Sequence, residues 1–343
     1  MAYTTINKST AHFNINTYTG NSSQGRSITG IGFAPDLVWA KCNSNGGNSH
    51  ILSDKVRGTN KNLQSNTTAA EIANNSQGYI SAFGSDGFTA YGGGSGYNEI
   101  NGSGNKYVIY NWKGNGSGSS NTAGATNSVV SVNTTSKFSI VKWSGYNTTV
   151  GHGLGVAPNM ILVKNLDDAQ NWHIYNKELG KNKYTILNSN GGSTTSTSVW
   201  NNTDPTSTVF SIGGSPFNNA NYIAYCFANT TGFSKFGTYT GSASATKGFV
   251  YTGFKPQFMM SANTQSDSNF MMWDNKRNTF NPTDKWLHAN GNDQEYTQAN
   301  SVNFLSNGFS FGVTGHPNEA EQYTYMCFGQ SLVGSNNVPC TAG

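Results

Sequence analysis

The chain has 343 residues, enough for two or three domains that each bury a core of their own. Charged residues make up only 10%, while 13% of the chain is aromatic, a combination that favours a packed fold over disorder. The net charge of +4 includes no basic run, and no apolar stretch reaches the length of a membrane span. The composition therefore argues against nucleic-acid binding and membrane insertion.

The N-terminal residues 1–13 are polar and carry no recognisable secretion signal. Low charge with many hydroxyl and amide side chains suits β-proteins that persist outside cells. We therefore expect a protein that is made in the cytoplasm of its host cell and released by lysis.

The four cysteines form no CxxC motif and no Cys/His pattern typical of a metal site, so no metal and no cofactor is predicted. Cys226 and Cys327 occupy the same position in two copies of a repeat, where buried packing is the favoured role. The sequence leaves open whether Cys340 forms an intermolecular bond.

A motif of turn glycine, proline and apolar strand occurs three times, and it is the strongest signal in the sequence. It spans residues 30–41 and 153–164 and recurs more loosely at 253–260. A Phe follows each proline at nearly constant distance, and each copy closes on an apolar strand that ends in an aromatic residue. The positions that define the repeat are Gly32, Pro35, Phe88 and Trp112, then Gly155, Pro158, Phe210 and Phe227, then Gly253, Pro256, Phe309 and Phe328.

Short apolar segments separated by Gly, Asn and Ser turns predict strands throughout, and no window has a sustained helical period. We therefore predict an all-β fold of three tandem, diverged modules of the β-sandwich or jelly-roll type, which is lectin-like. The length of the first linker predicts that module 1 sits apart from the other two. The predicted parts are an N-terminal arm (1–12), module 1 (13–113), a Gly/Ser/Thr/Asn linker (114–137), module 2 (138–228), module 3 (233–329) and a C-terminal tail (330–343).

No group of residues stands out as catalytic. The few Asp residues lie mostly in turn contexts, which their side chains favour through local hydrogen bonds. His152 occupies a position that is Thr29 and Thr252 in the other copies, so a turn role is favoured over general-base chemistry. We therefore predict no catalytic residue.

Four tryptophans lie in polar, turn-rich segments: Trp172, Trp200, Trp273 and Trp286. A flat aromatic face can stack against the C–H groups of a sugar, and a neighbouring amide such as Asn201 can add hydrogen bonds. Core packing is the more frequent role of a tryptophan. These five residues are nevertheless the candidates for a glycan-binding site.

Several segments, among them 200–203, 222–228, 232–241 and 273–278, resemble the repetitive Gly/Asn-rich proteins of aquatic tailed bacteriophages, which are uncharacterised or tail-fibre-like. The similarity covers most of the chain. It implies a virion or host-contact protein encoded by a phage, and it transfers no catalytic residue.

We therefore expect a non-enzymatic protein of the virion surface: a tail-fibre, receptor-binding or capsid-decoration protein. The expected partners are other virion proteins, further copies of the chain in a trimer, and a host surface glycan. Two alternatives stay open, a polysaccharide depolymerase and a self-assembling sheath or surface-layer subunit.

Overall fold

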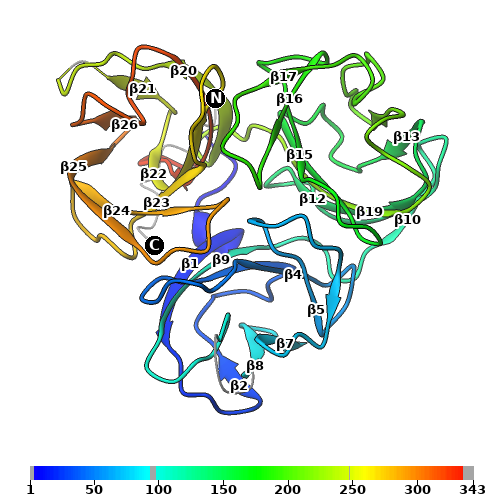
Figure 1. Ribbon diagram of the computed structural model, residues 1–343, viewed down its shortest axis with the longest axis horizontal. Helices are drawn as coiled ribbons and strands as arrows, with labels where there is room; N and C mark the ends of the chain where they lie inside the picture. Colours follow the sequence, from blue (N-terminus) through cyan, green and yellow to red (C-terminus); the bar gives the residue numbers. More distant parts are fainter. Residues whose placement is uncertain (1–3, 93–97, 247, 335–343) are drawn as a thin grey trace.

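The computed structural model describes residues 4–92, 98–246 and 248–334. The prediction of an all-β fold is confirmed: antiparallel strands make up these residues, apart from turns, loops and one 3₁₀ turn, η1 (Ser9–Ala11). Three lobes, one for each copy of the repeat, surround a common centre (Figure 1).

Each module has four inner strands, and their order is the same in all three modules. The last strand of the module lies between its first strand and the strand that follows the proline of the repeat, which we call the Pro-led strand. The orders are β1-β9-β3-β4, β12-β19-β14-β15 and β20-β27-β22-β23. The inner strands are β1 (Phe13–Thr19), β3 (Leu37–Cys42), β4 (Ile51–Asp54) and β9 (Lys106–Trp112); β12 (Phe138–Ser144), β14 (Met160–Asn165), β15 (His173–Asn176) and β19 (Asn221–Phe227); and β20 (Ser234–Thr240), β22 (Lys255–Asn263), β23 (Met271–Asp274) and β27 (Gln322–Gln330).

Outer strands cover the far face of each inner set. In module 3 they complete one eight-stranded sheet with β21 and β20 at its two ends, whereas modules 1 and 2 keep them partly in separate small sheets. The outer strands are β2 (Arg26–Ile28), β5 (Lys61–Asn62), β6 (Ile72–Ala73), β7 (Gly78–Phe83) and β8 (Phe88–Gly92); β13 (Thr148–Gly151), β16 (Lys183–Ile186), β17 (Thr194–Thr195) and β18 (Val209–Ile212); and β21 (Phe249–Tyr251), β24 (Thr283–His288), β25 (Tyr296–Leu305) and β26 (Gly308–Phe311).

The segment expected to be a linker, 114–137, contains two strands of module 2. These are β10 (Ser119–Asn121) and β11 (Ser128–Asn133), and β11 pairs along its whole length with β12. Ser128, Val130 and Ser131 of β11 are buried, which explains why this polar segment is ordered.

The central strands of each inner set, such as β3, β9 and β14, are buried on both faces, whereas part of β1 is exposed. In β14, Met160 and Leu162 point to the centre of the molecule, while Ile161 and Val163 point into the core of module 2. A continuous apolar run is the pattern expected of a strand that is covered on both sides. Each module therefore has a core of its own and also contributes to a shared one.

Aromatic rings from all three modules meet in the shared core. Phe13 of module 1 stacks on Phe328 of module 3, with 4.7 Å between the ring centroids, and Trp112 lies 6.2 Å from Phe227 of module 2. Module 1 is thus packed against its neighbours, contrary to the expectation that it sits apart. A long linker permits separation, but it does not prevent an apolar inner face from being buried against two others.

The residues that define the repeat have the same roles in each copy. Trp112, Phe227 and Phe328 lie in the shared core, whereas Phe88, Phe210 and Phe309 are buried in the cores of their own modules. The turn glycines Gly32, Gly155 and Gly253 have φ values of 87°, 72° and 86°, a conformation that side chains disfavour.

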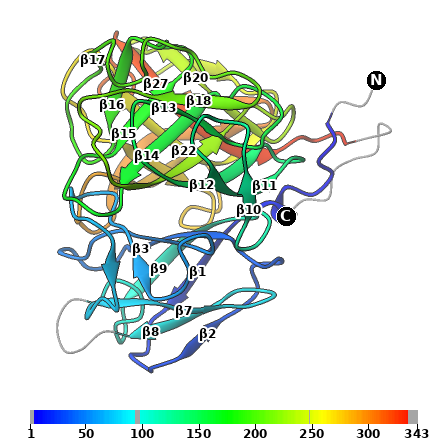
Figure 2. The same cartoon turned by 90° about the vertical axis from the view of Figure 1, so that its right-hand side faces the viewer.

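The two ends of the described chain lie together on one face of the molecule (Figure 2). The side-chain amide of Gln330 accepts a hydrogen bond from the Ser9 backbone and donates one to the Ile6 carbonyl. The first residues are therefore held against the last strand.

Candidate functional site

The three modules contact one another in a cyclic order. A hairpin of each module reaches the end of the Pro-led strand of the next one, through hydrogen bonds from the Glu71 N–H to the Leu166 carbonyl, from the Ser193 N–H to the Thr264 carbonyl and from the Glu295 N–H to the Asn43 carbonyl. We name these contacts junction 1/2, junction 2/3 and junction 3/1. Junction 3/1 closes the ring without a covalent linker.

A buried ionic network stabilises junction 3/1. The Arg277 Nε donates to the Asp274 carboxylate over 2.6 Å, and its Nη1 lies 3.3 Å from Glu295. From module 1, the Tyr110 hydroxyl donates to the same Asp274 oxygen over 2.9 Å. The side chain of Asp274 is fully buried, so its charge depends on these partners.

Junction 1/2 repeats this network residue for residue. Arg57 donates to Asp54 over 2.6 Å and lies 3.3 Å from Glu71, while the Tyr225 hydroxyl of module 2 donates to Asp54 over 2.9 Å. The recurrence of the same four side chains shows that the network belongs to the contact between modules.

Junction 2/3 lacks the network. The positions of the Asp, Arg, Glu and Tyr are filled there by Asn176, Leu179, Ser193 and Met326. The three charged residues and the tyrosine are all replaced there, as expected if a buried charge left without its partner is strongly destabilising.

Burial and the neighbouring carboxylate raise the pKa of Tyr110 and of Tyr225 well above the ordinary value, so both hydroxyls keep their protons and donate. Burial lowers the pKa of the Arg277 guanidinium, but Asp274 and its other anionic neighbours outweigh that effect and raise it above the usual range. The network is therefore a fixed set of charges rather than a proton-transfer site.

Two buried lysines add to the junctions. The Lys41 ammonium donates to carbonyls that include Asn292 of module 3, and the Lys164 ammonium donates to that of Thr68 of module 1. Burial lowers the pKa of each to about 8. Module 3 has Ala262 at this position, so junction 2/3 differs here as well.

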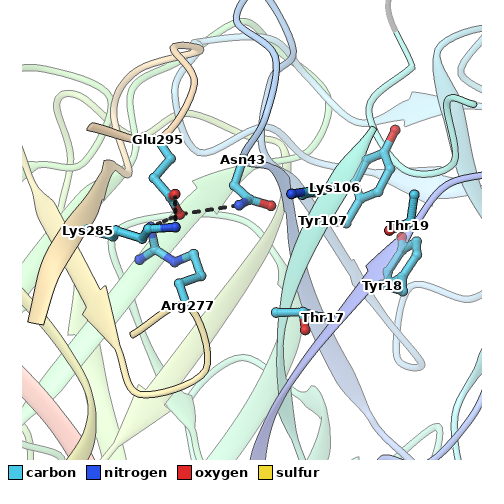
Figure 3. A pocket seen from close by; sticks show the side chains of 9 residues that line it. All are labelled: Thr17, Tyr18, Thr19, Asn43, Lys106, Tyr107, Arg277, Lys285 and Glu295. Atoms are coloured by element: carbon cyan, nitrogen blue, oxygen red, sulfur yellow. Dashed lines mark hydrogen bonds and ion pairs between the residues drawn. The ribbon is translucent and has the colours of Figure 1, made fainter. Parts of the chain in front are cut away.

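A polar groove of about 300 Å³ opens beside junction 3/1. Figure 3 shows Glu295, Lys285 and Arg277 on its module 3 wall, with Asn43 and Lys106 of module 1 facing them. Glu295 accepts from Lys285 over 3.0 Å and from Asn43 over 3.2 Å, in addition to Arg277. The charges of the module 3 wall are thus paired with one another, and we assign this wall to ring closure.

A second cavity, of about 260 Å³, lies beside β21, between this strand and the short connection from module 2 to module 3. We call it the β21 site. Lys235 and Tyr251 line it together with hydroxyl, amide and glycine residues: Asn229, Thr230, Thr231, Gly232, Ser234, Thr252 and Gly253.

Two large aromatic side chains of β21 are exposed here: Tyr251 lines the cavity, and Phe249 precedes it by two residues on the same strand. Phe249 is 50% exposed and Tyr251 is 53% exposed, and their spacing places them on one face of the strand. The Lys235 ammonium donates to the Tyr251 carbonyl over 2.7 Å and lies 5.3 Å from the centre of its ring. A rigid aromatic face, a cation and several hydroxyls are therefore brought together at the surface.

Three of the four tryptophans proposed for glycan stacking are core residues. Trp172, Trp200 and Trp273 are 0–2% exposed, and each indole N–H donates to an oxygen inside the protein. A buried indole offers no face to a sugar. Asn201 is exposed, but it has φ 51° in a tight turn and lies beside a tryptophan that faces inward.

Trp286 differs from these three because it is only half-buried. Its ring stacks on Tyr296 of the neighbouring strand, with 5.6 Å between the centroids, and its N–H donates to His288. It remains a candidate for stacking, although Tyr296 covers one face of the ring.

The sequence did not single out Phe249 and Tyr251, but it contained a signal for them. Strands β2, β13 and β21 pair with the strands that carry the Phe of the repeat. When these three strands are aligned, only β21 of module 3 has aromatic residues. That alignment needs the strand register, because module 1 is one residue shorter between this strand and the first glycine of its motif, which is Gly30, Gly153 or Gly253 in the three copies.

One cluster has the appearance of a nucleophile with its base. Ser268 Oγ lies 2.6 Å from His316 Nε2, whose Nδ1 lies 3.1 Å from the Tyr323 hydroxyl. In module 2, Asn165, Asn218 and Tyr222 form a comparable network at the same place with neither a serine nor a histidine. We therefore interpret the cluster as a lock for the loop that precedes the last strand of the module.

Within the described ranges, no three His, Cys, Asp or Glu side chains are arranged to hold a metal ion. Residues 4–92, 98–246 and 248–334 contain no helix with the length and hydrophobicity of a membrane span. Cys42, Cys226 and Cys327 are buried free thiols, whereas Cys340 lies outside the described residues.

Comparison with known proteins gives a family but no function. No curated protein matches the chain, and no solved structure matches it. One family model, described as a domain of unknown function (DUF7483), matches residues 8–331, which include all three modules. The chain therefore belongs to the DUF7483 family.

Proposed function

We propose that this chain is a non-enzymatic protein of a bacteriophage particle surface, of the tail-fibre, receptor-binding or capsid-decoration kind. The observation that carries the proposal is the closed ring of three modules around a shared aromatic core. The resemblance of the repeat segments to tail-fibre-like phage proteins supports the location, and the low charge suits a protein exposed outside cells.

The ring favours a binding or structural role over catalysis. Its buried carboxylates Asp54 and Asp274, together with Glu71 and Glu295, are committed to ion pairs that bind one module to the next. A glycoside hydrolase needs a pair of carboxyl groups that face a substrate instead.

We also infer that each module is a lectin-like β-sandwich. The support is that each inner set of strands packs against outer strands over a separate core, such as that formed by Val141, Phe210 and Tyr222 in module 2. The three modules already provide three-fold symmetry within one chain. We therefore propose a monomer with internal symmetry in place of the homotrimer predicted from the sequence.

Mass spectrometry and antibody labelling of purified phage particles test the location. We expect the protein at the particle surface, and its absence from intact particles would contradict the proposal. Light scattering of the purified chain tests the assembly. We expect the 36.7 kDa monomer, and a stable trimer would contradict internal symmetry as the functional form.

A further inference from the structure

The β21 site differs from the corresponding surface of the other two modules. The position of Phe249, which faces Ser310, is Ser27 in module 1 and Thr149 in module 2, facing Thr89 and Ser211. The apolar surface of an exposed Phe or Tyr stays in contact with water unless a ligand or partner covers it. An exposed aromatic pair in one module alone therefore indicates a specific use.

Two further positions separate the modules. Lys235 pairs with Cys327 on the last strand of its module, and the positions equivalent to Lys235 are Asn14 and Ser139. Tyr251 faces Gly308 on the neighbouring strand, where module 2 pairs Gly151 with Val209. Module 3 thus carries two aromatic residues and a cation where its sister modules have small polar residues or glycine.

In module 2 the corresponding surface is covered by the chain itself. Residues 121–126 run along β13, and a side chain at Gly151 would come within 2.0 Å of the Asn121 amide oxygen. Tyr251 occupies that position in module 3, so its side chain fills the place that such a segment would need. A polypeptide strand therefore cannot be seated on the β21 site as it is in module 2, which favours a different kind of ligand.

The residues beside Tyr251 indicate the chemistry of that ligand. The cavity is lined by hydroxyl and amide groups suited to the hydroxyls of a sugar, next to an aromatic face suited to its C–H groups. Among the described lining residues there is one cation, Lys235, and no carboxylate. An ammonium has three N–H donors, and the Tyr251 carbonyl takes one of them.

We propose that the β21 site binds an acidic sugar residue, which stacks on Tyr251 and Phe249 and pairs its carboxylate with Lys235. This proposal rests on the function proposed above, since it names the class of host glycan to which a particle-surface protein would attach. The pairing requires a monoanionic sugar of the uronic-acid type, because a neutral sugar leaves the ammonium without a charged partner.

The experiment uses the full chain and a panel of acidic polysaccharides that contain uronic or sialic acids. The best binder is then compared with its carboxyl-reduced form by titration calorimetry. We expect the reduced form to bind at least tenfold more weakly. Binding to no acidic polysaccharide of the panel, or equal binding of the two forms, would overturn the proposal.

Variants assign the binding to the site. Tyr251→Ala and Phe249→Ala are expected to weaken binding about tenfold, whereas Tyr251→Phe keeps the ring and retains binding. Lys235→Gln is expected to remove the preference for the acidic over the reduced form. Tyr146→Ala is the matched control, since Tyr146 is a 45% exposed aromatic residue of module 2.

All the changed side chains are at least partly exposed, so melting temperatures should stay close to that of the parent protein and loss of binding can be separated from unfolding. If Tyr251→Ala binds as tightly as the parent protein, the site assignment is wrong. The two proposals also fail separately: a protein absent from particles that still binds acidic glycans contradicts only the location, and a particle protein without such binding contradicts only the ligand.

Discussion

Exchanging the ionic network of junction 3/1 for the residues of junction 2/3 tests how the ring is held closed. Arg277→Leu alone leaves the buried carboxylate of Asp274 without its guanidinium. Removing one partner of a buried ion pair costs about 3–5 kcal/mol. Tyr110→Phe removes one hydrogen bond to a charged group, so the expected cost is about 1.5–3 kcal/mol.

The combined variant Tyr110→Met, Asp274→Asn, Arg277→Leu and Glu295→Ser reproduces the set found at junction 2/3. Replacing a whole buried ion pair by well-packed neutral residues is often close to neutral. We therefore expect the fourfold variant to lose less than about 2 kcal/mol and to be more stable than Arg277→Leu alone.

Urea unfolding followed by tryptophan fluorescence measures these differences, with the slope of the transition checked for each variant. Lys177→Gln, at an exposed position of module 2, serves as a control that should leave the midpoint unchanged. If the fourfold variant is no more stable than Arg277→Leu, the four side chains do not act as one exchangeable unit. A loss below about 1 kcal/mol for Arg277→Leu would likewise refute the argument from burial.

Three further outcomes follow from burial. Burial lowers the pKa of His173 and His288 to about 4. Since the folded state then binds fewer protons than the unfolded chain, stability should be complete above pH 6.5 and fall towards pH 4, by up to about 1.4 kcal/mol per pH unit for each histidine; a urea midpoint that does not change over this range would contradict it. Burial also raises the pKa of the Cys226 and Cys327 thiols; neither should react with a thiol reagent until urea unfolds the protein, and rapid labelling of either in the native state would show that the core of its module opens. Trp200→Ala should cost about 3–5 kcal/mol by leaving a cavity in module 2 while glycan binding persists below the melting temperature; unchanged stability with lost binding would restore a glycan role for Trp200.

The repeat and the strands could be predicted because they depend on local patterns. Proline and glycine fix the turn geometry, and apolar runs such as 160–163 mark buried strands. Those runs are apolar at consecutive positions, which is the pattern of a strand covered on both faces. That observation alone could have predicted that the modules pack against one another.

Ring closure and the β21 site could not be predicted from local sequence patterns. The partner of Asp274 is Tyr110, which is distant in the sequence, and nothing local indicates that these two side chains meet. Tryptophans in polar segments suggested a surface role, but Trp172 and Trp273 are fully buried, and Trp273 lies in a strand whose Met271 and Met272 are buried as well. The exposed pair on β21 emerges only when strand register aligns the three modules.

Three copies of one module are joined in a single polypeptide and packed around one shared core. This arrangement changes how such a protein can evolve. In a homotrimer each mutation enters the assembly three times, so a ligand site gained at one position is gained on every subunit, and a charge lost from one interface is lost from all. In this chain a mutation enters once. One lobe can therefore acquire an exposed aromatic pair, and one junction can replace its ion pairs by Leu179 and Met326, while the other copies keep the ring intact. A fused ring of this kind lets a surface vary on one lobe without requiring the other two lobes to change.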